Sequence, residues 1–586
     1  MSFCIHINTT NLKEISELLI QEGSQHIKLD NGSWLVGQLR HEQQKNISNE
    51  SIQSKSNDIG KLKTYLDSIC YQYFAVFYSE PLGQLFLLKD FTGCEAGYYK
   101  ITSSKIIVSD NVNSVLNATD DNQIDEMAAF NFIYFEMPWK PQSLFKDIYS
   151  ALNDTVYCFD KQNNSFTLQD YFKVQSTKNC QTLTLRDSIT AAHEKRLSTD
   201  NAIFLSGGID SQVMAIALRK DLGTKNLSSY NFSIKGAKNS EHAEAKQTAN
   251  RLGIDFEHVE VDPKKEIDFE KLFLEQNSPY VGSIPLSNIF SKVNNNRNVT
   301  FFGGQDTRLH TPSLTQLDLL YWQFNSIIGS ASKSILNTAG KLGAFTLMHA
   351  RRKERTEKFD RLIRLVSNLS KPQNFLAYRH FHIHQFDFIN EKLATHGALN
   401  ELKTILSNQS FSTPRDTYNK IVELNWRKQY MFDIEYMVGN CRGFGFDCVM
   451  PFYDKELAQF SANIDFDLAT KITKGRAGHS NKQVRVNKFA LREAYKGELD
   501  DSLIYRDKAV CPTTYMFFNG ALKASLNDFI YSNPLVGTEL GEAIYINELI
   551  ALAKKKHQNW KPEDNAILVV IFNAIVISQY YKKIQS

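Results

Sequence analysis

The sequence has no strong excess of charge of either sign. Its 67 lysines and arginines nearly balance 64 aspartates and glutamates, which leaves a formal net charge of +3. Proteins that bind nucleic acid usually carry a marked basic excess or a basic stripe, so no nucleic-acid partner is expected. At 586 residues, with 42% hydrophobic residues, the chain is long enough for more than one domain with sizeable cores.

A cysteine motif is also missing. The eight cysteines, at positions 4, 70, 94, 158, 180, 441, 448 and 511, include no C-x-x-C pair. In a chain of this length such scatter is typical of reduced residues in a cytoplasmic protein.

Long hydrophobic runs are absent as well. The N-terminus lacks the basic and apolar regions of a signal peptide. The most apolar run spans residues 566–577, twelve residues that include Asn573. That run is too short to cross a bilayer. We therefore expect a buried C-terminal helix and no membrane partner.

Two patterns of hydrophobicity divide the chain. Short apolar runs at 33–37, 73–78, 84–88, 97–99 and 105–109 indicate a β-rich layer, and polar stretches at 42–60 and 175–184 indicate a loop and an interdomain linker. From about residue 190, expected strands at 202–205, 227–234 and 256–261 alternate with expected helices at 212–222 and 241–252. This alternation predicts a parallel sheet covered on both faces by helices, which binds ligands at the carboxyl ends of its strands. Beyond about residue 310 we expect mostly helices.

A glycine-rich stretch follows the first of these strands. Residues 203–213 read Ile-Phe-Leu-Ser-Gly-Gly-Ile-Asp-Ser-Gln-Val, an apolar strand that runs through a turn into a helix. Gly207 and Gly208 let the backbone turn sharply and approach an anion closely. The amides of the turn and of the helix N-terminus would form a cradle for phosphate. The lysine of a Walker A loop is missing, so the stretch is a different kind of phosphate loop.

The polar side chains of the stretch fit the same purpose. Ser206 and Ser211 can donate hydroxyl hydrogen bonds, and Asp210 is placed to hold Mg²⁺ between phosphate oxygens. The stretch resembles the S-G-G-x-D-S loop of the ATP pyrophosphatases, which hold pyrophosphate and release AMP. An ordinary glycine-rich turn is the alternative.

Further segments match one family in order along the chain. They lie at 87–99, 106–110, 232–234, 240–241, 283–285, 302–306, 445–454, 488–493 and 505–508. Each is weak alone, but the ordered series resembles the asparagine synthetase-like enzymes. The resemblance implies an α/β protein with an Ntn-hydrolase-like αββα domain at 1–175. An adenine-nucleotide α-hydrolase-like synthetase domain with a parallel sheet and a large helical C-terminal part would follow at 186–586.

The resemblance also implies a reaction that needs ATP and Mg²⁺. In the family, a carboxylate attacks the α-phosphorus of ATP, pyrophosphate leaves, and an amine displaces AMP to form an amide. By resemblance, Asp210 and Asp306 would carry the metal ions, and Lys488 and Lys508 would offset phosphate charge. Lys508 would also stabilise the oxyanion of amide formation. Taken singly, each lysine would more often lie on a solvated helix face, and the place of both in the ordered series of motifs reverses that preference. The expected nucleotide-binding residues are Leu205, Ser206, Gly207, Gly208, Asp210, Ser211, Ser233, Gly303 and Gly304, with adenine near Leu205 and Ser233.

The N-terminus departs from the family pattern. Glutamine-dependent members expose an N-terminal cysteine as nucleophile, whereas this sequence has Ser2 at that position and Cys4 two positions later. The arginine-containing segment that holds glutamine is missing as well. We therefore expect the first domain to be a remnant without glutaminase activity.

The second glycine turn also departs from it. Asparagine synthetase has a glutamate at the position of Gly303, and the β-lactam-forming relatives have a tyrosine there. The group that deprotonates the amine is therefore unassigned, with Asp433, Glu435 and Tyr436 as candidates.

Together these departures favour an amine that belongs to the substrate itself, as in lasso-peptide macrolactam synthetases and β-lactam synthetases. The substrate would be a small molecule or a peptide, with a precursor peptide and a companion peptidase as candidate partners. An amidotransferase that uses free or partner-supplied ammonia is one alternative. A catalytically inactive nucleotide-binding scaffold is the other, although retention of Asp210, Asp306, Lys488 and Lys508 argues against it.

Overall fold

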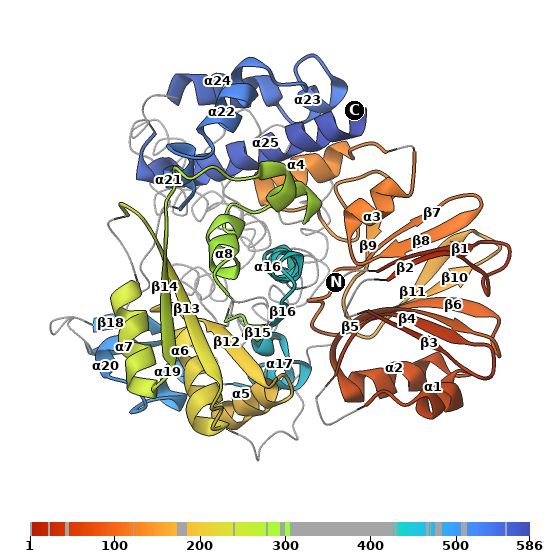
Figure 1. Ribbon diagram of the computed structural model, residues 1–586, viewed down its shortest axis with the longest axis horizontal. Helices are drawn as coiled ribbons and strands as arrows, with labels where there is room; N and C mark the ends of the chain where they lie inside the picture. Colours follow the sequence, from red (N-terminus) through yellow and green to blue (C-terminus); the bar gives the residue numbers. More distant parts are fainter. Residues whose placement is uncertain are drawn as a thin grey trace, which may run out of the picture.

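The computed structural model describes residues 3–20, 24–41, 46–120, 122–172, 184–237, 241–276, 279–293, 299–304, 426, 431–464, 468, 470–474, 483–505, 513–556 and 560–586. These residues form an α/β protein with two antiparallel sheets in the N-terminal part, a parallel sheet in the middle of the chain, and a helical C-terminal layer (Figure 1).

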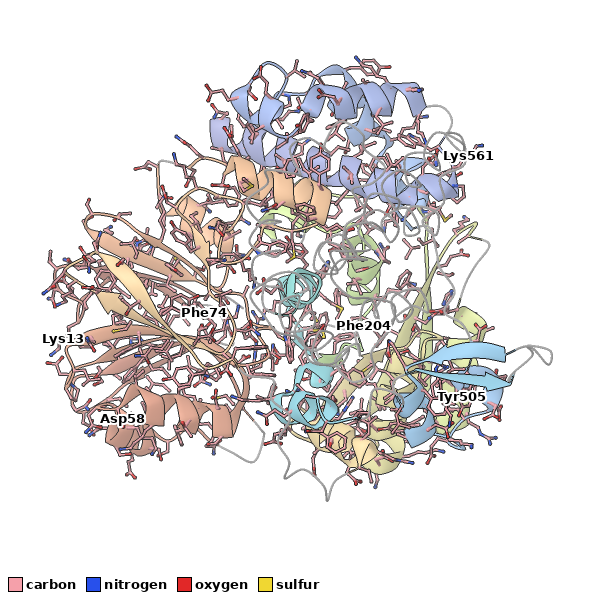
Figure 2. The ribbon with its side chains drawn as sticks, turned by 180° about the vertical axis from the view of Figure 1, so that it is seen from behind. Lys13, Asp58, Phe74, Phe204, Tyr505 and Lys561 are labelled. Atoms are coloured by element: carbon pink, nitrogen blue, oxygen red, sulfur yellow. The ribbon has the colours of Figure 1, made fainter. Side chains whose placement is uncertain are left out.

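The N-terminal part is built from two antiparallel sheets that face each other. The first has the order β2 (Ile15–Ile20), β1 (Phe3–Asn8), β8 (Lys105–Ser109), β7 (Tyr98–Ile101) and β9 (Tyr149–Ser150). The second has the order β11 (Ser165–Asp170), β10 (Thr155–Asp160), β6 (Gln84–Lys89), β5 (Cys70–Ser79), β4 (Trp34–His41) and β3 (Ser24–Lys28). Phe74 points into the space between the sheets, where its ring lies 5.9 Å from that of Phe3 (Figure 2).

Helices cover the outer face of each sheet. Alternation along β8 turns Ile106 and Val108 inward and Ile107 outward. The outward face packs against α3 (Val112–Asn117), while α1 (Asn49–Lys55) and α2 (Ile59–Ile69) cover the second sheet. The expected αββα layering and the short strands are therefore confirmed.

One local expectation in this part is wrong. The stretch at 42–60 contains α1, where a loop was expected. Ser48 caps this helix by accepting a hydrogen bond from the Ser51 amide, and Ile52 anchors it in the core. Its remaining residues are mostly polar and face solvent. For this reason the sequence pattern indicated a loop and not a helix.

The parallel sheet has the order β14 (Asp255–Val261), β13 (Leu227–Ile234), β12 (Asp200–Phe204), β15 (Val299–Phe302) and β16 (Asp447–Val449). One face packs on α5 (Leu185–Glu194), α6 (Ile209–Ile216) and α7 (His242–Leu252), and the other on α8 (Ser283–Phe290) and α16 (Met431–Gly443). Ile203 faces the first group of helices and Phe204 the second. The predicted doubly covered parallel sheet is confirmed. The helix expected at 212–222 begins at Ile209 and ends in a π-helical turn over Ala217–Asp221.

The strand order fixes where a ligand can bind. From β12 the chain adds β13 and β14 on one side, and it then adds β15 and β16 on the other. Neighbouring strands whose connections leave in opposite directions open a crevice at their carboxyl ends, which is the usual ligand site of open α/β sheets. Here that point lies between β12 and β15.

A helical layer closes the C-terminal part. It contains α21 (Thr513–Phe518), α22 (Lys523–Tyr531), α23 (Glu539–Ala543), α24 (Ile546–Lys556) and α25 (Asn565–Gln585). The sequence predicted an apolar run of twelve residues, too short to cross a bilayer. In the structure the helix continues beyond residue 577, and by length and composition α25 could cross a membrane. In its most apolar window, however, 61% is buried, and Asn573 Nδ2 donates to the Phe132 carbonyl at 3.0 Å. This helix is packed as a core helix, against α4 (Glu126–Phe135) among others.

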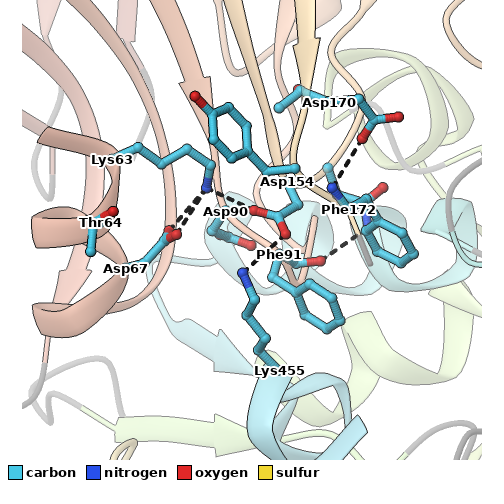
Figure 3. A network of polar contacts seen from close by, with 12 residues as sticks. Lys63, Thr64, Asp67, Asp90, Phe91, Asp154, Asp170, Phe172 and Lys455 are labelled. Carbon is cyan, nitrogen blue, oxygen red and sulfur yellow. Dashed lines mark hydrogen bonds and ion pairs between the residues drawn. The ribbon is translucent and has the colours of Figure 1, made fainter. Parts of the chain in front are cut away.

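Buried ion pairs join the N-terminal sheets to the rest of the chain. The fully buried carboxylate of Asp154 lies 2.8 Å from the Lys63 ammonium of α2 and 3.1 Å from that of Lys455 (Figure 3). Lys455 begins α17 (Lys455–Ser461) beyond β16. The linker expected at 175–184 lies almost entirely outside the described residues, so the boundaries at 175 and 186 stay a prediction.

Candidate functional site

The predicted phosphate loop lies at the switch point of the parallel sheet, between the end of β12 and the start of α6. Its two serines brace the loop from within. The Ser206 amide donates to Ser211 Oγ at 3.0 Å, and the Gly208 amide donates to Ser206 Oγ at 3.1 Å. The Ser211 hydroxyl lies 3.0 Å from the Ser206 carbonyl and 3.1 Å from that of Gly208. In this structure the hydroxyls hold the turn in shape, a role that the sequence reasoning missed.

The first turn of α6 has the properties of an anion site. Gly208 is its N-cap residue and provides no side-chain cap. The first amides of a helix have no partner within the helix, and the helix dipole places partial positive charge there. A phosphate group would supply the missing acceptors. Gly207 and Gly208 therefore lie where the sequence placed them, beside a helix end suited to phosphate.

The second glycine turn packs directly on this helix. It follows β15, and a Cβ atom on Gly304 would lie 3.4 Å from the Ser211 Cα. Two turns distant in sequence thus meet at the switch point, as the expected nucleotide site requires.

Gly303 faces a different environment. Its amide donates to the Val449 carbonyl at 2.9 Å. A Cβ atom here would lie 2.5 Å from Met437 Cε and closer still to Met450 Sδ. The two methionines, 5% and 1% exposed, fill the volume that a larger side chain would need. A glutamate at this position would require both methionine side chains to move, and nothing in the sequence around Gly303 pointed to these two methionines.

Lys488 reaches the phosphate loop from far along the chain. It precedes α19 (Phe489–Ala494) in a left-handed conformation, with φ of 55°. Its ammonium lies 2.7 and 2.5 Å from the two carboxylate oxygens of Asp210, with side chains 18% and 24% exposed. Two predicted site residues are therefore in direct contact, and Lys488 does not lie on a solvated helix face.

The residues present fit a magnesium nucleotide. The Asp210 carboxylate offers the oxygen ligands that Mg²⁺ prefers, and a site of this kind takes its remaining ligands from phosphates and water. Within the described ranges no three histidine, cysteine or acidic side chains cluster as a preformed metal site. Asp306 and Lys508 lie outside the described residues, so their roles stay predictions.

The expected adenine contacts lie at the ends of β12 and β13. Both backbone groups of Leu205 are used within the sheet, since its amide donates to the Tyr230 carbonyl at 2.9 Å and its carbonyl accepts from Asn231 Nδ2 at 2.8 Å. The Ser233 hydroxyl lies 2.9 Å from His258 Nε2. A contact of either residue with adenine stays a prediction.

Polar side chains fill the region around the start of β1. The Phe3 amide donates to Asp110 Oδ1 at 2.9 Å, and Gln38 Nε2 donates to Asp110 Oδ2 at 3.1 Å. From α16, the Arg442 guanidinium enters the same region and pairs with the fully buried Glu95. This cluster ties α16 to the N-terminal sheets, and scattered charged residues gave no sequence signal for it.

The candidate residues on α16 for deprotonating the amine pack against the N-terminal part of the chain. Glu435 is paired with Lys89 and Lys140 of the N-terminal part. Tyr436 is buried in a small cluster with Met137. Nothing is described of the Asp433 side chain. Glu435 is therefore held in ion pairs with two lysines, and a role as the base stays a prediction.

Comparison with known proteins identifies the family. The family described as asparagine synthase matches residues 184–576, more than half of the chain. No curated protein gives a significant match. The chain is similar to the glutamine phosphoribosylpyrophosphate amidotransferase from B. subtilis complexed with ADP and GMP, with 8% identity, 53% of this chain and 70% of that chain covered, and a TM-score of 0.18.

It is also similar to a structure titled as the allosteric regulatory enzyme of purine biosynthesis, with 8% identity, 52% and 70% coverage and a TM-score of 0.19. Both scores are too low to support a functional comparison. The family match covers the parallel sheet, the phosphate loop and Lys488. The chain belongs to the asparagine synthase family and carries its ATP-dependent amide-forming domain.

Proposed function

We propose that the protein is an AMP-forming amide ligase that adenylates a substrate carboxylate and couples it to an amine of the same substrate. The observation that supports it most is the contact of Lys488 with Asp210 beside the first turn of α6. A metal-binding carboxylate and a phosphate-neutralising cation are the two groups that pyrophosphate release requires.

The residues would divide the work as follows. The N-terminus of α6 and the braced loop hold phosphate oxygens without rearrangement, because Ser206 and Ser211 already fix the turn. ATP supplies the activated phosphorus and Mg²⁺ the charge that screens its oxygens. Asp210 would bind the metal ion. The Lys488 ammonium would then exchange its ion pair with Asp210 for one with the oxygens of the leaving pyrophosphate.

Two observations support an amine from the substrate. Gly303 carries no side chain, and Met437 and Met450 occupy the space beside it, so position 303 offers no carboxylate to bind or deprotonate ammonia. The region around Phe3 is occupied by the buried pair of Arg442 and Glu95, which supports a first domain without glutaminase activity. Intramolecular coupling in a peptide, giving a macrolactam, is the product class that we propose, with a precursor peptide and a companion peptidase as partners.

The test is a product analysis. The protein is incubated with ATP, Mg²⁺ and peptides that carry a free N-terminal amine and a side-chain carboxylate. We expect AMP, pyrophosphate and a product lighter by one water. ADP and phosphate as products would contradict adenylation. A product formed only with added ammonium, or glutamate formed from glutamine, would contradict the substrate amine.

A further inference from the structure

A second charged cluster lies away from the phosphate loop, where α16 meets the N-terminal sheets. Lys89, at the end of β6, places its ammonium 3.3 Å from Glu435 Oε1, and the ammonium of Lys140 contacts the same oxygen. The three side chains are 1%, 6% and 6% exposed for Lys89, Lys140 and Glu435. Two ammonium groups and one carboxylate leave one excess positive charge in the interior.

This excess charge is not balanced within the cluster. Lys89 also donates to the Ala151 carbonyl at 3.1 Å, which is a neutral acceptor. An unbalanced charge in the interior is costly unless it is paired or the group loses its proton. Burial, together with the charge of Lys89, lowers the pKa of Lys140 to about 8. Among the residues that the structure describes, the cluster therefore lacks one negative charge.

A cavity of about 40 Å³ opens beside Lys140 and Glu435. Its wall is rich in hydrogen-bond donors, since Ser150, Tyr98, Tyr436 and Gln142 also line it. The Ser150 hydroxyl is buried and has no hydrogen-bond partner in the described part of the chain. A buried hydroxyl without a partner is rare and calls for an acceptor in the cavity.

We propose that this cavity binds a small monovalent anion, a halide or a carboxylate group, between Lys140 and the Ser150 hydroxyl. The anion would supply the missing charge and the missing acceptor at once, whereas a water molecule would supply only the acceptor. The volume accommodates a few heavy atoms, and the single excess charge favours a monovalent over a divalent anion. Bound there, it would strengthen the contact of α16 with the N-terminal sheets. The proposal does not depend on the proposed function.

The direct test is a crystal of the full chain soaked in bromide, with anomalous diffraction. A bromide peak at hydrogen-bond distance from Lys140 Nζ and Ser150 Oγ is expected. The absence of such a peak, or peaks at surface positions only, would exclude a halide, and together with no stabilisation by acetate it would overturn the proposal.

Solution measurements provide an independent test. The thermal midpoint is recorded against chloride and against acetate, with gluconate keeping the ionic strength constant. An anion that binds the folded state stabilises the protein by mass action, so the thermal midpoint should rise with its concentration. A rise with acetate but not with chloride would identify a carboxylate as the ligand.

Ser150→Ala keeps all three charges and removes one hydrogen bond to the anion, so the apparent affinity should fall about tenfold. Lys140→Met should abolish the dependence, while the control Lys13→Met, which removes an exposed pair with Glu80, should leave it unchanged. Equal anion dependence in the wild type and in Ser150→Ala would also overturn the proposal.

Discussion

Lys488 and Asp210, 278 residues apart in sequence, form an ion pair at the mouth of the phosphate loop. The ion pair holds the Lys488 ammonium and the Asp210 carboxylate beside the phosphate loop, and each neutralises the charge of the other while no phosphate is bound. Because each side chain is about one fifth exposed, solvent reaches the pair, and a bound phosphate or metal ion can compete for either partner. The contact therefore suits a site that alternates between free and nucleotide-bound states.

Replacing Asp210 by Asn should remove catalysis and leave the fold intact. Asparagine keeps the shape but loses the charge that would bind the metal, so we expect a loss of about 100-fold or more in pyrophosphate release. Pyrophosphate is measured by a coupled assay, with circular dichroism as the check on folding. Asp58→Asn, which removes an exposed ion pair with Lys61, is the matched control and should retain full activity. Wild-type rates in Asp210→Asn would reject the metal role.

Lys488→Met should lower kcat more than it raises KM for ATP. The ammonium is needed most when negative charge develops on the leaving oxygens, so its loss acts on the transition state. The double variant with Asp210→Asn should be about as inactive as the more damaged single variant, since the two residues act together. A purely additive double variant would show that they act independently.

Gly303→Ala should destabilise the protein. The new methyl group would overlap the flexible ends of Met450 and Met437, which must repack, so we expect a cost at the lower end of the about 1–3 kcal/mol typical of overpacking. Urea unfolding measures the change. Gly60→Ala in helix α2, where the nearest neighbour of an added Cβ is Asp58 Oδ1 at 3.4 Å, should be neutral or stabilising. If Gly303→Ala were as stable as the wild type, the methionines would not be what excludes a side chain there.

The sequence was sufficient to predict what repeats locally. Hydrophobic alternation predicted the strands that became β5, β6 and β8, and strand–helix alternation predicted the parallel sheet. The phosphate loop was identified because a strand, a glycine pair and a helix start follow one another with Ser206, Asp210 and Ser211 at the positions of the S-G-G-x-D-S loop. The sequence could not reveal that Ser211 braces the loop or that Met437 and Met450 fill the space at Gly303. It also could not reveal that Lys140 and Lys89 share Glu435. These contacts join residues from distant elements, so they depend on tertiary packing and have no local signal.

Asp154→Asn should weaken the junction between the two parts of the chain. The carboxylate pairs with Lys63 and Lys455. Lys63 keeps its ion pair with Asp67, and the Lys455 side chain is 37% exposed, so we expect a cost of about 1–3 kcal/mol, below that of a fully uncompensated buried charge. Asparagine tolerates the φ of 50° at this position, so the backbone is not the cause. Loss of a single cooperative unfolding transition would be the clearest sign. An unchanged unfolding free energy would contradict the importance of the junction.

His193 should make the protein sensitive to mild acid. Its Nδ1 lies 2.7 Å from the Ile189 carbonyl and the ring packs among Phe302 and Phe452, and burial lowers its pKa to about 4. The unfolded chain, with a pKa near 6.5, takes up the proton first. The contribution of the neutral His193 ring to the free energy of unfolding is therefore complete above pH 6.5, and it is lost as the pH falls toward 4.

The comparison with His193→Phe isolates this effect. Between pH 7 and 4.5 the unfolding free energy of the wild type should fall by about 2–3 kcal/mol more than that of the variant. Parallel pH profiles for the two proteins would contradict a neutral buried histidine.

The most direct measurement follows the oxygen atoms of the substrate. A peptide labelled with oxygen-18 in its carboxylate is turned over once with ATP and Mg²⁺, and the products are examined by mass spectrometry. Attack on the α-phosphorus transfers one labelled oxygen to AMP, so we expect labelled AMP and unlabelled pyrophosphate, and no labelled AMP with Asp210→Asn. Label in inorganic phosphate, with ADP as the nucleotide product, would contradict the account.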